Sequence, residues 1–225
     1  MNGVYLKRYC FTILLFISFF CLNEISAQDV IVSSTKLDQN TKGESLNQLN
    51  YKPSKDGVLK FDNGNWVTVK LDIPGALAQD DNFIHLSYSL LDTIELWTKD
   101  RNGKLKMQTQ TGQAFKFNTR PYASTDFVFP VSQNIQDYYF RIYSSKPIVI
   151  PIDVVKNDKL IERLTLKDYL YGIFSGIILV MFLYNFVLYF LTRDKSYAYY
   201  VTYLFTLIFA QLALFGYTDR YITYD

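Results

Sequence analysis

Cysteine and histidine are nearly absent from this chain, and their scarcity excludes several kinds of chemistry. The only cysteines are Cys10 and Cys21, and the only histidine is His85. Both cysteines lie in a segment that we expect to be removed, so the mature chain would have no disulfide and no cysteine nucleophile. Because clustered metal-binding motifs are missing as well, we expect no metal site and no cofactor.

The sequence also lacks the motifs of common enzymes and the charge of a nucleic-acid-binding protein. It has no G-x-S-x-G motif and no glycine-rich phosphate loop, and a serine or threonine nucleophile would have only His85 as its base. A pair of glycosidase carboxylates has no fixed spacing in sequence and stays open. The net charge of +2 comes from interspersed charges of both signs. We therefore predict neither catalysis nor binding to nucleic acid.

Residues 1–27 have the pattern of a secretory signal peptide. Lys7 and Arg8 precede the apolar stretch Tyr9–Leu22, and the small residues Ser26 and Ala27 end the segment. The apolar stretch is short for a membrane span, so we expect cleavage after Ala27, with an uncleaved anchor as the alternative.

Two long charge-free runs occupy the last part of the sequence. Tyr169–Thr192 and Ser196–Thr218 are each long enough to cross a hydrocarbon core about 30 Å thick. We predict two transmembrane helices, at residues 169–192 and 196–218, joined by a cytoplasmic loop at 193–195 and followed by a periplasmic tail at 219–225. The loop carries Arg193 and Lys195, as the positive-inside rule prefers. Basic residues also precede the first run, so the orientation rests mainly on the cleaved signal.

The region between the signal peptide and the first apolar run has three parts. Residues 28–50 are polar and are interpreted as a leader or a loosely attached first strand. Residues 51–156 are predicted to form a β-sandwich or jelly roll, because several short strands follow one another with turns between them. Residues 157–168 are charged with a helical pattern and are interpreted as a connector.

The strand predictions rest on alternation and on turn residues. Apolar and polar residues alternate in Asn65–Ile73 and in Phe83–Leu90, as in half-buried strands. Asn63-Gly64 and Asn102-Gly103 each predict a hairpin turn. Further strands are predicted at residues 92–98, 104–109, 125–129, 138–143 and 148–155.

Short motifs in both halves of the chain point to one family. In the membrane segment they are Tyr171-Gly172-Ile173-Phe174, Gly176, Leu183-Tyr184-Asn185, Leu188-Tyr189, Arg193-Asp194, Ser196-Tyr197, Tyr199-Tyr200 and Tyr203-Leu204. In the region before it they are Asn65-Trp66, Ile94-Glu95-Leu96-Trp97, Asn102-Gly103, Thr111-Gly112, Arg120 and Tyr138-Tyr139-Phe140-Arg141. By these motifs the chain resembles the bacterial seven-transmembrane receptors with diverse intracellular signalling modules, in their second type of extracellular domain and their first two membrane helices.

The resemblance implies a fold, a location and a function. The implied fold class is an all-β ectodomain, a jelly roll similar to carbohydrate-binding modules, followed by two transmembrane α-helices. The implied location is the bacterial inner (cytoplasmic) membrane, multi-pass, with the N-terminal domain in the periplasm. The family has seven helices and a cytoplasmic output module, so we expect the sensory, ligand-binding portion of a receptor without those later parts. A membrane-tethered carbohydrate-binding module without signalling and a structural protein that binds partner helices are the alternatives.

Four residues are candidates for binding a small-molecule or saccharide ligand. Trp66 and Trp97 offer flat apolar faces for stacking on sugar rings, and Arg120, beside Tyr122 in a loop, can grip a carboxylate or hydroxyl groups. The alternative is a core position for Trp97 and a structural salt bridge for Arg120. His85, on a strand, is interpreted as structural.

Three residues of the first apolar run are candidates for packing against other helices. Gly172 and Gly176 have the GxxxG spacing that lets helices approach closely. Asn185 is interpreted as bonding to another helix rather than as part of a functional relay. The expected partners are thus the lipid bilayer, further transmembrane helices or a signalling partner, and an unidentified ligand.

Overall fold

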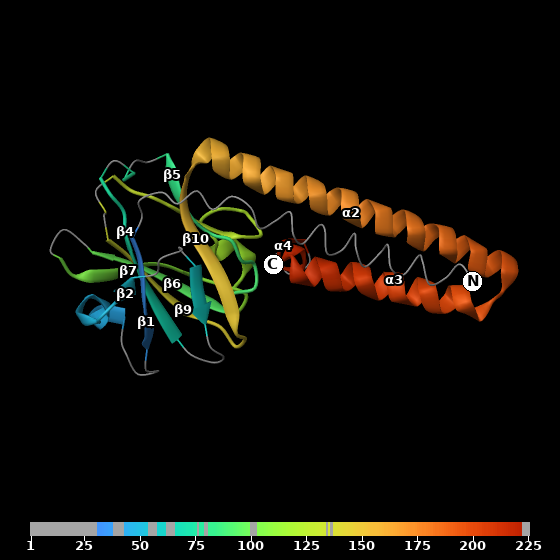
Figure 1. Ribbon diagram of the computed structural model, residues 1–225, viewed down its shortest axis with the longest axis horizontal. Helices are drawn as coiled ribbons and strands as arrows, with labels where there is room; N and C mark the ends of the chain where they lie inside the picture. The colour runs from blue at the N-terminus through green and yellow to red at the C-terminus, as the bar shows by residue number, and fades with distance from the viewer. Residues whose placement is uncertain are drawn as a thin grey trace.

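A β-sandwich and a hairpin of long helices that projects from it make up the structure, a computed structural model (Figure 1). The predicted signal peptide, the end of the predicted tail and several loop residues lie outside the part of the chain that the structure describes. The structure describes residues 31–37, 43–53, 58–61, 66–75, 77–78, 81–99, 103–133, 135 and 137–221.

Within the described residues, ten strands form the two sheets of the sandwich, and every pair of neighbours is antiparallel. The six-stranded sheet runs, in spatial order, β2 (Lys52–Pro53), β1 (Ile31–Leu37), β4 (Trp66–Asp72), β9 (Asp137–Tyr143), β6 (Thr93–Lys99) and β7 (Leu105–Thr111). The four-stranded sheet runs β3 (Val58–Phe61), β10 (Ile148–Lys156), β5 (Asn82–Leu86) and β8 (Phe127–Pro130). Two short 3-10 helices complete the sandwich, η1 (Gly43–Gln48) and η2 (Phe117–Thr119).

The core lies between the two sheets and is built from the alternating apolar residues of their strands. Val67, Val69 and Leu71 of β4 point into it, as the alternation predicted. Phe129 of β8 meets Phe140 of β9 edge to face, with ring centroids 5.1 Å apart, and so joins the two sheets. Predicted strands at 65–73, 92–98, 104–109, 125–129, 138–143 and 148–155 are confirmed within a residue or two.

One of the two predicted hairpins is wrong. β6 and β7 pair directly, and Gly103 between them has a φ of 75°, while Asn102 lies outside the described residues. Asn63 and Gly64 also lie outside the described residues, but the strands on either side of them lie in different sheets, because β3 pairs with β10 while β4 pairs with β1 and β9. An Asn-Gly pair favours the backbone angles of a tight turn, but it does not specify which strands bond to each other.

The predicted leader contributes a full strand to the sandwich. β1 lies between β2 and β4 and pairs with β4 along its whole length, from Ile31 opposite Asp72 to Leu37 opposite Trp66. Its sequence, IVSSTKL, is mostly polar. Ladder hydrogen bonds involve the backbone alone, so polar side chains do not prevent a strand from pairing.

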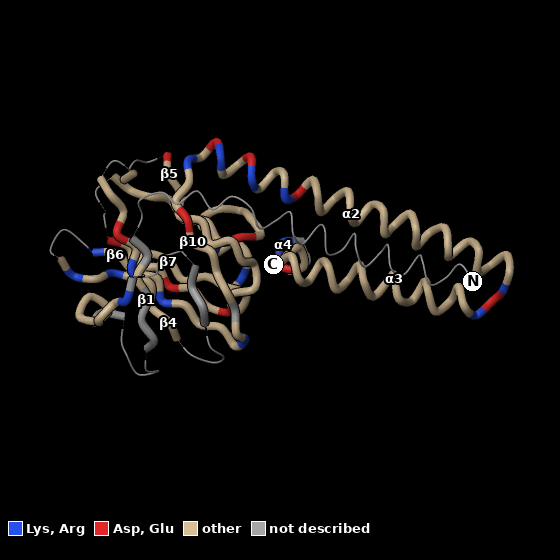
Figure 2. The backbone as a smooth tube through the Cα atoms, in the orientation of Figure 1, with Lys and Arg blue, Asp and Glu red and all other residues tan. Residues whose placement is uncertain are grey.

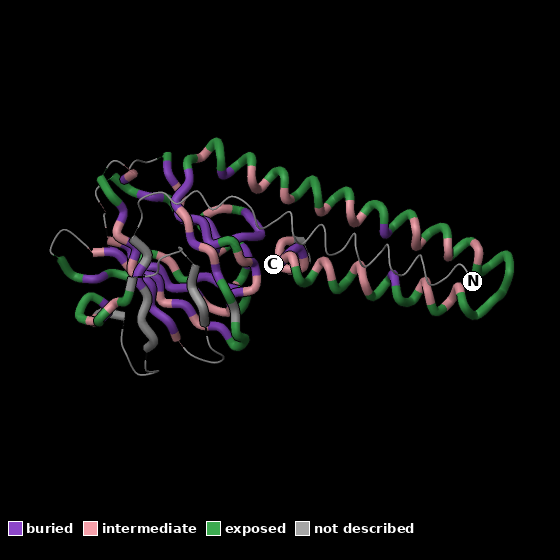
Figure 3. The backbone as a smooth tube through the Cα atoms, in the orientation of Figure 1, coloured by how far each residue is buried: buried purple, intermediate pink, exposed green. Residues whose placement is uncertain are grey.

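The helical hairpin consists of α2 (Asn157–Thr192) and α3 (Lys195–Leu214), followed by the short α4 (Tyr217–Tyr221). The predicted connector and first span form one continuous helix. Arg193, with a φ of 53°, ends α2, and the Asp194 carboxylate accepts the Ser196 backbone N–H and caps α3. Charged residues are confined to the ends of the hairpin (Figure 2), and most of its surface is exposed (Figure 3).

The second apolar run does not form one helix, contrary to the prediction for residues 196–218. α3 ends at Leu214, and Phe215 and Gly216 form a turn before α4. Gly216 has a φ of 74°, in the left-handed region that interrupts an α-helix. The turn brings α4 back to the sandwich (Figure 1).

Candidate functional site

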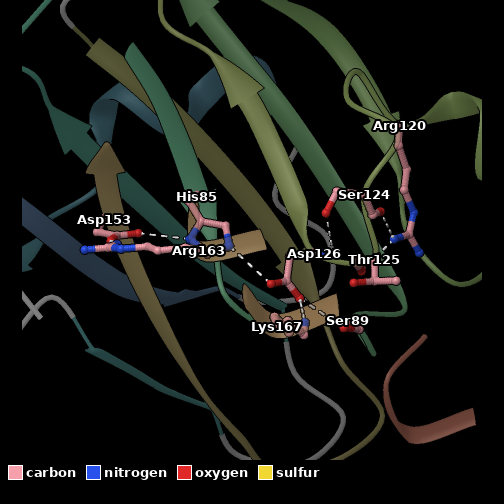
Figure 4. A network of polar contacts seen from close by, with 9 residues as sticks. All are labelled: His85, Ser89, Arg120, Ser124, Thr125, Asp126, Asp153, Arg163 and Lys167. Carbon is pink, nitrogen blue, oxygen red and sulfur yellow. Dashed lines mark hydrogen bonds and ion pairs between the residues drawn. The ribbon is translucent and has the colours of Figure 1, made fainter. Parts of the chain in front are cut away.

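A set of polar and charged side chains gathers where the four-stranded sheet meets the first turns of α2. They come from strands β5 and β10, from the segments next to β5 and β8, and from α2. We call this set the junction network (Figure 4), and its members are His85, Ser89, Asp126, Asp153, Arg163 and Lys167.

His85 lies between two carboxylates at the centre of the junction network. Its Nε2 atom is 3.2 Å from Asp126 Oδ2, and its Nδ1 atom is 3.3 Å from Asp153 Oδ1. β5 is hydrogen-bonded between β10 and β8, with His85 opposite Asp153 on one side and Val128 on the other. The side chains of His85 and Asp126 are 6% and 2% exposed, so this contact is shielded from water.

Each carboxylate also binds a cation of α2. Arg163 donates to Asp153, and Lys167 donates to Asp126 at 2.6 Å. Ser89 donates to the same oxygen of Asp126 at 3.1 Å. Arg163 and Lys167 are four residues apart and therefore lie on one face of the helix. That face is attached to the sandwich by two ion pairs.

The pKa values in the network follow from these contacts. Burial alone would lower the pKa of His85, but the hydrogen bonds and charges of Asp126 and Asp153 outweigh burial and raise it to about 9. Burial would raise the pKa of Asp126, but His85 and Lys167 outweigh it and lower that pKa to about 2. The pKa of Asp153 is lowered in the same way by His85 and Arg163, against the effect of burial. At neutral pH His85, Asp126 and Asp153 are therefore all charged.

A second set of contacts attaches α4 to the sandwich. The Arg120 guanidinium donates to the backbone carbonyls of Ser124 and Thr125 at 2.9 and 2.8 Å and lies 4.3 Å from the ring centroid of Phe127. Its Nη2 atom is 3.8 Å from Asp219 of α4. Arg120 therefore forms the salt bridge that was one of its two predicted roles.

α4 is also joined to α2. Tyr217 donates to Asp168 of α2, and Arg220 lies 3.7 Å from the same carboxylate. A Cβ atom at Gly216 would lie 2.9 Å from the Cβ of Ser89, so the turn before α4 packs directly on the sandwich. Sandwich, α2 and α4 thus contact one another pairwise.

The two tryptophans lie together on the outer face of the six-stranded sheet, which we call the aromatic face. The Arg141 guanidinium lies 4.0 Å from the ring centroid of Trp66, whose ring centroid is 5.3 Å from that of Tyr143. Trp97 donates to Glu95, which also binds Arg141 at 3.3 Å. Both indoles are half-buried. The residues that pack with them are Leu46, Leu49, Tyr51, Leu105 and Tyr139.

The four ligand-binding candidates therefore do not form one site. Trp66 and Trp97 share the aromatic face, whereas Arg120 and Tyr122 lie near the helices. Tyr122 is half-buried and packs edge to face on Phe83 at 5.9 Å between ring centroids.

The two glycines among the helix-packing candidates have open space beside them. Within the described part of the chain, a Cβ atom added to Gly172 or Gly176 would meet nothing within 4 Å. Asn185 donates to the backbone carbonyl of Met181, four residues earlier in its own helix, at 2.7 Å. This hydrogen bond is intrahelical, and the interhelical bond that we expected stays a prediction.

The junction network was largely missed by sequence reasoning. Asp126 and Asp153 are isolated acidic residues with no motif around them. The one usable signal was the spacing of Arg163 and Lys167 at the start of a predicted helix. It shows that they share a face, but it does not show what they bind.

Among the described residues, no group of three or more His, Cys, Asp and Glu side chains is arranged to hold a metal ion. The fold and the junction define a membrane protein in which a β-sandwich domain is attached to a pair of helices long and apolar enough to cross a membrane.

The comparisons with known proteins agree with this class. The family model described as 7TMR-DISM extracellular 2 matches residues 25–156, and that described as 7TM diverse intracellular signalling matches residues 167–225. The first match alone covers more than half of the chain, so the chain belongs to the 7TMR-DISM family. It has the extracellular domain and membrane helices of a signalling receptor. A comparison with curated proteins finds no match.

Proposed function

We propose that this chain is the sensory input part of a bacterial receptor, with the sandwich in the periplasm and the hairpin in the inner membrane. The sandwich binds a small-molecule or saccharide ligand, and the hairpin responds to that binding. The observation that carries the proposal is the attachment of the sandwich to both outer ends of the hairpin. The ion pairs of Arg163 and Lys167 attach α2, and the Arg120–Asp219 pair attaches α4.

This attachment is more than an anchor requires. A domain that only captures a ligand at the membrane works as well on a flexible linker, because binding needs no fixed orientation relative to the helices. Here β10 runs directly into α2, with Lys156 ending the strand and Asn157 beginning the helix. A shift of the four-stranded sheet therefore moves the first turn of α2, as signal transmission requires.

The aromatic face is the part of the sandwich that we assign to the ligand. Half-buried indole rings beside a charged pair offer apolar stacking surface and hydrogen-bonding groups together. The saccharide class is the natural choice, because sugar rings present both apolar C–H faces and hydroxyl groups. Trp66 and Trp97 are the only tryptophans of the chain, so tryptophan fluorescence reports on this face alone.

The full chain in lipid nanodiscs should therefore show saturable changes in tryptophan fluorescence when titrated with a panel of saccharides and small anionic solutes. Trp66→Ala should weaken binding by about tenfold or more, because indole rings are frequent hot spots. Lys116→Gln, an exposed change near η2, is the matched control and should leave the affinity unchanged. Thermal unfolding of each variant checks that the fold is intact.

The assignment of the ligand to this face would be wrong if no member of the panel changed the tryptophan fluorescence, or if Trp66→Ala bound its ligand with unchanged affinity. Binding that leaves the distance between sandwich and α2 unaltered would instead favour a tethered binding module without signalling.

A further inference from the structure

The contacts of His85 require an imidazolium. A neutral imidazole carries one N–H, so it can donate to only one of two carboxylates, whereas the protonated ring donates to both. Asp126 and Asp153 face opposite ring nitrogens at 3.2 and 3.3 Å. Removing the proton would leave one nitrogen lone pair directed at a carboxylate in a buried site, and that contact is repulsive.

The two carboxylates that His85 joins are the same two that hold α2. Asp126 binds Lys167, and Asp153 binds Arg163. The imidazolium thus sets the spacing between the segment before β8 and strand β10, and with it the spacing of the two acceptors that the helix needs. A change in that spacing cannot suit both cations of α2 at once.

We propose that His85 is a proton-operated switch at the sandwich–helix junction: the imidazolium holds α2 against the four-stranded sheet, and the neutral ring releases it. The use of this movement as an output rests on the proposed function, but the switch itself stands on the junction alone. The charged and polar groups around the ring come from each element packed against it. They are Asp126 before β8, Asp153 on β10, Ser89 after β5, and Arg163 and Lys167 on α2.

The sign of the pH dependence follows from the raised pKa of His85. The pKa of His85 is about 6.5 in the unfolded chain and about 9 in the folded protein. The protonated ring therefore contributes its full stabilisation at pH values below about 6.5, and this stabilisation is lost as the pH rises through about 9. The junction is therefore closed at neutral pH and opens under alkaline conditions.

The single histidine makes the test direct. The full chain in nanodiscs, labelled with ¹³C in the histidine ring, gives one histidine signal that needs no assignment. Its titration midpoint is expected near pH 9, well above the ordinary value. A midpoint near 6.5 would overturn the proposal, because the ring would then be neutral in the closed junction.

The movement of α2 relative to the four-stranded sheet is measured with two spin labels on the full chain, again in nanodiscs. Lys146→Cys and Glu162→Cys introduce exposed attachment points before β10 and on α2, in a chain whose native Cys10 and Cys21 are replaced by serine. The distance between the labels should change with the same midpoint as the histidine signal. A distance that stays constant through the titration of His85 would overturn the proposal.

Two variants separate the switch from general unfolding. His85→Gln, whose single N–H₂ group can face only one of the two opposed carboxylates, should give the high-pH distance at every pH. Asp153→Asn keeps the histidine but removes one of the charges that raise its pKa, so the midpoints of the histidine signal and of the label distance should move to lower pH together.

Lys99→Gln is the control variant. It alters the remote pair with Asp137 at 2.7 Å and should leave both midpoints unchanged. A Lys99→Gln shift equal to that of Asp153→Asn would count against the switch. Failure to find a ligand would not count against the switch, because none of these measurements uses a ligand.

Discussion

Asp126 shows how one buried charge is made tolerable at the scale of a single residue. Its side chain is 2% exposed, and a carboxylate removed from water in this way is strongly unfavourable unless it is paired and hydrogen-bonded. His85, Lys167 and Ser89 all bond to it, each from a different part of the chain. The carboxylate therefore connects strand, loop and helix, and its loss should weaken the attachment of all three.

Asp126→Asn should lower the free energy of unfolding by roughly 3 kcal/mol, since it removes the carboxylate that pairs with the buried His85 imidazolium and with Lys167. The asparagine keeps the size of the side chain but directs an N–H₂ group at one of the donors. Denaturant unfolding of the full chain in detergent micelles measures the change. Asp81→Asn, at an exposed position, is the control and should have almost no effect. Equal stability of the two variants would show that the pairing of Asp126 adds little.

At the scale of an element, the turn between α3 and α4 shows how backbone conformation decides packing. Phe215 and Gly216 end a run that composition alone marks as one continuous span. Gly216 combines a positive φ with a close approach to Ser89 on the sandwich. Glycine is therefore needed at this position for two reasons: it adopts a positive φ without strain, and it leaves room for Ser89.

Gly216→Ala and Gly103→Ala together distinguish these reasons. The two glycines have nearly equal φ values, 74° and 75°, so alanine should cost about 1–2 kcal/mol of backbone strain at either position. A Cβ atom at Gly103 meets nothing described within 4 Å, whereas at Gly216 it lies 2.9 Å from Ser89 Cβ. Gly216→Ala should thus lower the melting temperature more than Gly103→Ala does. If the two variants melt together, the contact with Ser89 is not tight.

At the scale of the whole molecule, the hairpin returns the chain to the side from which it came. Both α2 and α4 contact the sandwich at one end, and the loop at Arg193 and Lys195 lies at the other. Figure 2 shows the long uncharged middle of both helices between these two charged ends. A bilayer around that middle places the sandwich and the loop on opposite sides.

Cysteine labelling tests this orientation in cells. Ser145→Cys before β10 and Ser196→Cys beside the loop are matched, nearly isosteric changes at exposed positions. A membrane-impermeant maleimide added outside the inner membrane should label Cys at position 145 in intact spheroplasts, and at position 196 only after the membrane is opened. Labelling of both positions before opening would contradict a transmembrane hairpin.

Some of these features were predictable and others were not, for physical reasons. Alternation in Asn65–Ile73 identified β4 and its buried face, because side chains on a strand point to opposite sides in turn. The polar strand β1 could not be found in this way, since its pairing depends on the backbone and on β4 beside it. Likewise, the Asn63-Gly64 pair predicted a turn, but it could not show that the strands on either side belong to different sheets.

The sequence by itself determined the two helices, the strand-rich domain and the family resemblance, because these depend on composition and on periodicity between near neighbours. Only the tertiary structure decided that His85 lies between Asp126 and Asp153 and that both carboxylates hold α2. The physical reason is distance along the chain: Asp126 is 41 residues from both His85 and Lys167. No local pattern records such a contact, and the sheet register and the path of α2 have to be formed before it exists.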